Sequence, residues 1–119
     1  MDNKETIEDE KKIIQKFCED RDWDQFHNPK DLAIMLSTEA AELLEIFRYK
    51  DEKQIEEIMN GPKRRQVEDE VADLFFGVLR FAQKNDIDIS TALDTKMVEN
   101  VKKYPAELVK GKNKKYNEY

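Results

Sequence analysis

The sequence contains few of the residues that cross-link small secreted domains or interrupt secondary structure. Its one cysteine, Cys18, cannot form an internal disulfide, which favours a reducing compartment. Three glycines and three prolines are too few for a β fold with many tight turns. No apolar run approaches the roughly 18 residues of a membrane span, and the N-terminus, MDNKETIEDE, is too acidic for a signal peptide. We therefore expect a cytoplasmic protein that does not bind membranes.

Positive charge is also in short supply. The chain has 21 Lys and Arg against 27 Asp and Glu, a formal net charge of -6. Such a chain should repel nucleic-acid polymers, and it would bind a nucleotide only through a cation or a local basic patch. Hydrophobic residues make up 39% of the 119 positions, enough for one core, so we expect a single domain over residues 1–119. Residues 106–119 form a basic, polar tail in this interpretation.

The apolar residues recur at helical spacing, and no long interior stretch alternates with the period of a β-strand. The expected helices run from about Thr6 to Asp20, Lys30 to Tyr49, Lys63 to Lys84, and Asp88 or Ser90 to Tyr104. Residues 51–62 contain at most a short helix, because Asn60-Gly61-Pro62 stops it. The sequence therefore predicts an all-α fold, a bundle of four or five helices.

The second predicted helix places a carboxylate on its buried side. Its apolar arc consists of Leu32, Met35, Leu36, Leu43, Ile46 and Phe47. At about 100° per residue, Glu39 falls inside this arc and Glu42 falls at its edge, whereas Glu45 points away. An unpaired buried carboxylate costs several kcal/mol, so the position of Glu39 requires a partner.

The third predicted helix repeats this pattern. Val67, Val71, Leu74, Val78 and Phe81 form its expected core line. Glu70 lies on the border of that line and Asp73 lies further round on the same side. Gly77 lies between Glu70 and Asp73 in angle, one helical turn further along, so no bulky side chain covers the space beside the two carboxylates. Side chains three residues apart are close enough to share a ligand, so two facing pairs would surround one cavity with four carboxylates. All-oxygen sites suit Mg²⁺ or Mn²⁺.

Other interpretations of these carboxylates remain open at this point. Glu39 and Glu70 could form salt bridges with Lys or Arg on another helix. A ferritin-like di-iron site needs Glu-x-x-His motifs, and the only histidine, His27, lies in a predicted loop. An EF-hand needs a run of oxygen ligands around a central glycine, which the chain lacks.

Two further groups of residues have both a structural and a functional interpretation. On the fourth predicted helix, Asn100 falls on the apolar side between Lys96 and Lys103, an arrangement that could brace helices or bind phosphates. The only tryptophan, Trp23, could close the core or stack on a planar ring, with Tyr49 as a second wall. His27 is either a substrate contact or an exposed loop residue.

Taken in order, these segments resemble the MazG-type nucleoside triphosphate pyrophosphohydrolases. EAAELLEIFRYK and EDEVADLFFGVLR resemble the paired E-x-x-E and E-x-x-D motifs of that superfamily. EDRDWDQFHNPKDL, KMVENVKKYP and KKYNEY resemble its dCTP pyrophosphatase branch in order and spacing. The resemblance covers about Phe17 to Tyr116.

The resemblance implies how these residues are used. Glu39, Glu42, Glu70 and Asp73 would hold Mg²⁺, and a nucleoside triphosphate would be hydrolysed between its α and β phosphates. Trp23 and Tyr49 would flank the base, while Lys96, Asn100 and Lys103 would face the sugar and phosphates. Members of this family are commonly homodimers or homotetramers whose sites use more than one chain.

Two positions depart from the pattern of the animal members of that branch. Those animal members carry a histidine at the position equivalent to Ile14 and a tyrosine at the position equivalent to Gly77. Because Ile14 cannot hydrogen-bond a base, the resemblance supports the reaction class more than a preference for cytosine.

The expected reaction is attack of a metal-activated water on the α-phosphorus, with Glu39 and Glu42 as the catalytic residues and Glu42 as proton acceptor. Two alternatives remain: a helical interaction module without catalysis, and an enzyme for another pyrophosphate-containing metabolite.

Overall fold

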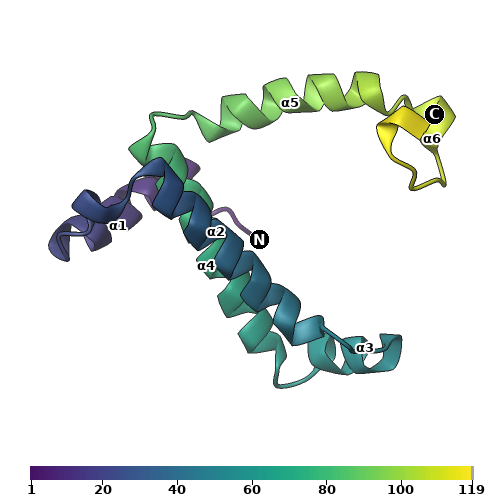
Figure 1. Cartoon of the computed structure of the whole chain (residues 1–119), viewed down its shortest axis with the longest axis horizontal. Coiled ribbons are helices and arrows are strands. Elements are labelled where there is room, and N and C mark those ends of the chain that lie inside the picture. Colours follow the sequence, from purple (N-terminus) through teal and green to yellow (C-terminus); the bar gives the residue numbers. More distant parts are fainter. Residues whose placement is uncertain (119) are drawn as a thin grey trace. The chain divides into compact units, whose positions relative to one another are not determined.

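The structure is a computed structural model that describes residues 1–118 (Figure 1). It divides into two compact units, Met1–Asp86 and a second that begins at Ile87. The first unit contains α1 (Ile7–Asp20), the 3₁₀ turn η1 (Asp24–Phe26), α2 (Pro29–Phe47), α3 (Glu52–Asn60) and α4 (Arg64–Lys84). The second contains α5 (Ile89–Lys103), α6 (Ala106–Val109) and η2 (Tyr116–Glu118). The all-α prediction is confirmed for the part of the chain described.

Side chains at the helix starts explain where the helices of the first unit begin. Thr6 and Asp9 form a reciprocal capping box at the start of α1. Asn28 caps α2 by accepting a hydrogen bond from the Asp31 amide at 2.8 Å, and Pro29 occupies the first helical position. Each cap satisfies amide groups that the helix itself leaves free, and a cap of this kind contributes about 1 kcal/mol.

The core of the first unit lies around α4, which packs against α1, α2 and α3. In Figure 1, α2 runs alongside α4 over much of its length. Leu32 and Leu79 are each 1% exposed, and burying a leucine stabilises a fold by roughly 1.5–3 kcal/mol. The other buried apolar residues are Ile14, Cys18, Ile58, Val67 and Ala82.

The predicted core line of the third helix is wrong in part. Val71 is 50% exposed, whereas Gly77, Leu79 and Ala82 are buried. The buried positions move round the helix because α4 contacts three different helices along its length. The space at Gly77 is also occupied: a Cβ there would lie 2.8 Å from Cδ2 of Leu36 on α2.

The second unit has more helical structure than the sequence predicts. Residues 106–118 contain α6 and η2, so the described chain has six α-helices rather than four or five. Pro105 ends α5 and leads into the single turn of α6. The ring of Tyr116 packs edge-on against Tyr104, with centroids 6.4 Å apart. The α5 helix buries none of its residues: Leu93, Met97, Val98 and Val101 are each about half exposed or more.

Two other expectations concern the end of the second helix and membrane-spanning segments. Tyr49 lies beyond the end of α2, at a φ of 61°, rather than in its last turn. Across residues 1–118, each helix is too short or too polar to cross a bilayer.

Candidate metal and substrate site

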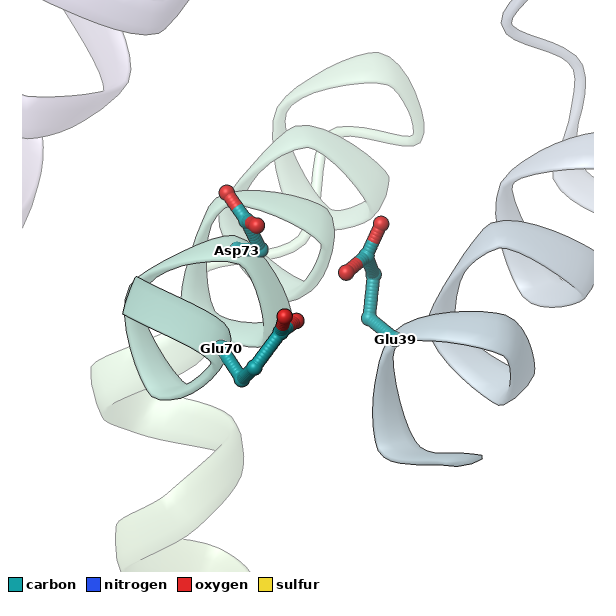
Figure 2. Close-up of side chains that lie close together, drawn as sticks. All are labelled: Glu39, Glu70 and Asp73. Carbon is teal, nitrogen blue, oxygen red and sulfur yellow. The ribbon is translucent and has the colours of Figure 1, made fainter. Parts of the chain in front are cut away.

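Three of the four predicted carboxylates meet between α2 and α4. Figure 2 shows Glu39 on α2 facing Glu70 and Asp73 on α4. Each contributes one oxygen to a group whose members all lie within 4.8 Å of one another. We call these three residues the carboxylate cluster. The i, i+3 spacing of Glu70 and Asp73 and the close packing of α2 on α4 bring them together.

The carboxylates of the cluster repel one another, and a positive charge among them would relieve this repulsion. Glu39 and Glu70 are half-buried, and Oε2 of each is buried without a hydrogen-bond partner. Burial, and then the neighbouring carboxylates, raise the pKa of Glu39 above its ordinary value. Burial and the Glu42 carboxyl are the first causes that raise the pKa of Glu70. The ion pairs found within residues 1–118 include neither side chain, so the salt-bridge interpretation has no support there.

Glu42 lies beside the cluster and is exposed to solvent. Its carboxyl group interacts with both Glu39 and Glu70, and it raises the pKa of each. Carboxylate oxygens from two rigid helices are ligands that suit a hard divalent cation, so this group could hold a metal ion.

An apolar pocket of about 420 Å³ opens next to the cluster, and its size falls in the range of small-molecule sites. Its lining residues are Ile13, Ile14, Phe17, Trp23, Met35, Glu39, Asp73 and Phe76. Glu39 and Asp73, two members of the carboxylate cluster, thus lie in the wall of a mainly hydrophobic and aromatic cavity. Phe17 packs edge-on against both Trp23 and Phe76, at centroid distances of 5.5 and 5.9 Å. Trp23 therefore lines this pocket, and its contact with a base stays a prediction.

The other two aromatic candidates lie outside the lining of this pocket. His27 accepts a hydrogen bond at Nδ1 from Nε of Arg80, at 2.9 Å, and its ring centroid is 6.2 Å from that of Trp23. Tyr49 is 87% exposed, and the guanidinium of Arg48 lies 4.6 Å from its ring centroid. Within this chain, His27 therefore supports the pocket wall, and Tyr49 is a surface residue.

The three candidates on α5 belong to the second unit. Lys96 forms an ion pair with Glu99 at 3.1 Å. The amide nitrogen of Asn100 lies 3.7 Å from the sulfur of Met97. The ammonium group of Lys103 lies 4.9 Å from the Tyr116 ring centroid. Their contact with a substrate stays a prediction.

Sequence reasoning missed one residue of this region, Arg80. It is 1% exposed and bonds to Asp24, His27 and Gln83. Arg80 lies four residues after Phe76 and seven after Asp73, on the side of α4 that faces the pocket. A charge at a buried helical position is the signal that identified Glu39, and it could have identified Arg80 as well.

Similarity to known proteins shows to which family this all-α chain, with its carboxylate cluster beside an apolar pocket, belongs. Residues 34–119 match the MazG-like family. The chain is 32% identical to human dCTP pyrophosphatase 1 over 114 residues, 95% of this chain and 67% of that protein. The mouse protein of the same name has the same identity and coverage. A crystal structure of a pyrophosphatase from Archaeoglobus fulgidus matches with a TM-score of 0.76 at 33% identity, covering 88% of this chain and 97% of that one.

The chain therefore belongs to the MazG-like family. The predicted resemblance is confirmed, as is the predicted class of enzyme, a hydrolase of phosphoric anhydride bonds.

Proposed function

We propose that this protein is a Mg²⁺-dependent pyrophosphohydrolase that cleaves a nucleoside triphosphate into the monophosphate and pyrophosphate. The observation that carries the proposal is the carboxylate cluster beside the pocket: Glu39, Glu70 and Asp73 each bring an oxygen within 4.8 Å of the others, and Glu39 and Glu70 each have a buried oxygen without a hydrogen-bond partner. Carboxylates attract the cation, the cation attracts a polyphosphate, and the adjacent cavity accepts an apolar planar group.

The donor set fits Mg²⁺ or Mn²⁺, because all of its ligand atoms are carboxylate oxygens. Glu39, Glu70 and Asp73 would hold the ion, with Glu42 beside them. Bound there, the ion supplies charge that neutralises phosphate oxygens and makes a bound water more acidic. Glu42 is exposed, and its carboxyl group interacts with both Glu39 and Glu70, so we assign it the proton of the attacking water.

The pocket is suited to the nucleobase. Trp23 offers a ring face, and base–aromatic stacking contributes about 1–3 kcal/mol. The names of the human and mouse relatives make dCTP the first substrate to test. Ile14 in the pocket lining offers no hydrogen bond to a base, so we expect weaker discrimination between bases than in an enzyme with a polar reader there. Lys96, Asn100 and Lys103 are assigned to the sugar and phosphates.

A pyrophosphate-release screen tests the function. The purified chain is incubated with each common ribo- and deoxyribonucleoside triphosphate and Mg²⁺. We expect pyrophosphate and the monophosphate from at least one of them, and loss of both products in Glu39→Gln. Glu45→Gln is the matched control, since Glu45 lies on the same helix and pairs with Arg48 on the surface. In H₂¹⁸O the label should enter the monophosphate, because water attacks the α-phosphorus. Label in pyrophosphate would contradict the assignment of the bond.

We also propose that the protein assembles as a homodimer or homotetramer. The exposed apolar side chains of α5 support this, because the chain by itself leaves Leu93, Met97 and Val101 in contact with water. Light scattering coupled to size exclusion measures the mass, and a monomer at micromolar concentration would contradict the proposal.

A further inference from the structure

The buried guanidinium of Arg80 connects α4 to the turn that follows α1. Its Nε donates to Nδ1 of His27 at 2.9 Å, and its NH1 donates to Oε1 of Gln83 at 2.7 Å. Its NH2 forms a hydrogen-bonded ion pair with Oδ1 of Asp24. Asp24 and His27 are more than 50 residues away in sequence and belong to a single turn around η1. Arg80 is thus the centre of a network that attaches this turn to the helix bundle.

Gln83 extends the network to α1. Its side-chain amide nitrogen donates to the backbone oxygen of Lys11 at 2.6 Å and lies 3.3 Å from Oε1 of Gln15. Arg80 and Gln83 therefore bind the turn and α1 to the same face of α4. Charge-assisted hydrogen bonds are stronger than neutral ones, and a fully satisfied polar network makes the arrangement of its members more rigid.

Trp23 depends on this turn for its position. It directly precedes Asp24, and its amide donates to the oxygen of Cys18 at 3.0 Å. Its side chain is 38% exposed and contacts Phe17 edge-on, so neighbouring apolar groups cover it only in part. On its N-terminal side, Asp22 adopts a φ of 56°, in the left-handed region that aspartate tolerates better than most residues. The attachment of Asp24 and His27 to Arg80 restrains the chain directly after Trp23.

We propose that Arg80 is a positioning residue for substrate recognition: it holds the turn of residues 24–27 on α4 and thereby fixes the Trp23 ring as a wall of the pocket. This proposal rests on the proposed function, because it assigns that pocket to the base. Arg80 does not itself line the pocket. Its loss should therefore weaken substrate binding and leave the chemical step at the carboxylate cluster intact.

The single tryptophan makes the positioning directly measurable. Asp24→Ala removes the carboxylate that pairs with Arg80. Because this leaves a guanidinium that is 1% exposed without its counter-charge, the variant should be less stable, and circular dichroism first establishes that it is folded. Arg80→Lys keeps the charge but lacks the planar fork that serves three acceptors at once. Asp20→Ala is the matched control: it removes an aspartate of the same segment that pairs with Lys16 on the surface.

The experiment compares acrylamide quenching of Trp23 in the nucleotide-free proteins, together with KM and kcat for the substrate found in the screen. In Asp24→Ala and Arg80→Lys we expect about twofold stronger quenching and a KM about tenfold higher, with kcat within twofold of the wild type. Asp20→Ala should match the wild type in all three. Unchanged quenching in the folded variants, or a fall in kcat at constant KM, would overturn the proposal.

Failure of the proposed function would give a different pattern. If the wild-type protein hydrolyses no nucleotide, the quenching comparison still decides whether Arg80 fixes Trp23. Stronger quenching would then support the positioning role in a pocket for another ligand, and unchanged quenching would refute it.

Discussion

Replacing Glu39 with glutamine should make the metal-free protein more stable. Oε2 of Glu39 is buried without a partner, and its pKa is raised by burial and by Glu42, Asp73 and Glu70. The cluster oxygens lie within 4.8 Å of one another, and two like charges at that distance repel by roughly 0.9 kcal/mol in water and by roughly 3.5 kcal/mol in a medium typical of a protein surface. Because the Glu39 side chain is only partly buried, we take the lower part of this range. Glu39→Gln should then raise the free energy of unfolding by about 1–2 kcal/mol, or the Tm by roughly 4–8 °C.

The same substitution should abolish the stabilisation that a divalent cation provides. A ligand at 100 times its Kd stabilises the native state by about 2.7 kcal/mol. Thermal unfolding in EDTA and in increasing Mn²⁺ measures both effects in one series. The wild type should start lower and rise with Mn²⁺, whereas Glu39→Gln should start higher and stay constant.

Glu45→Gln distinguishes this explanation from a general effect of removing negative charge. Glu45 lies on α2 but pairs with Arg48 at 3.3 Å on the surface, so its loss should change the Tm little and leave the response to Mn²⁺ intact. A salt bridge at Glu39 predicts the opposite starting point, because removing one partner of an ion pair destabilises the protein. A lower Tm of Glu39→Gln in EDTA, with a normal response to Mn²⁺, would therefore refute a metal site at this position.

Three further predictions concern the surroundings of the site. Burial, and then the charge of Arg80, lower the pKa of His27, while Asp24 opposes this and Lys84 adds to it. Neutral His27 therefore contributes stability that is present above about pH 6.5 and is lost as the pH falls toward its lowered folded pKa. The stability difference between wild type and His27→Gln, measured by urea unfolding at pH 7.5 and 5.5, should shift against the wild type at the lower pH. Gly77→Ile should destabilise the protein by about 1–3 kcal/mol and weaken Mn²⁺ binding, since its Cβ alone would lie 2.8 Å from Leu36; an unchanged Tm and Mn²⁺ affinity would contradict this. Asn28→Ala should cost about 1 kcal/mol through loss of the α2 cap, while Asn28→Asp should retain most of it, as urea unfolding would show.

The helices and the carboxylate cluster could be predicted from the sequence because both depend on short-range spacing. Asn28 followed by Pro29 marks the start of α2, and the i, i+3 positions of Glu70 and Asp73 fix their shared side of α4. Glu39 was identifiable because a charge at an apolar helical position needs an explanation. The structure agrees on each of these points.

The remaining features depend on which helices meet, and periodicity does not contain that information. Val71 has the spacing of a core residue but is half exposed, because the neighbours of α4 change along its length. The bonds of Arg80 to Asp24 and His27 join segments more than 50 residues apart. Tyr49 follows α2 at a positive φ, and no spacing rule predicts such a turn for a tyrosine.

The contact between Leu36 and Gly77 lies on the α2–α4 interface next to the carboxylate cluster. Leu36 lies three residues before Glu39, and Gly77 lies four residues after Asp73, so the two pairs are adjacent along the interface. Only a residue without a side chain lets Leu36 approach α4 as it does, because a Cβ would be 2.8 Å from its Cδ2. The apolar contact holds the helices together at the point where the carboxylates repel them. A larger residue at position 77 should therefore disturb the carboxylate cluster, and with it the proposed metal affinity, as well as stability.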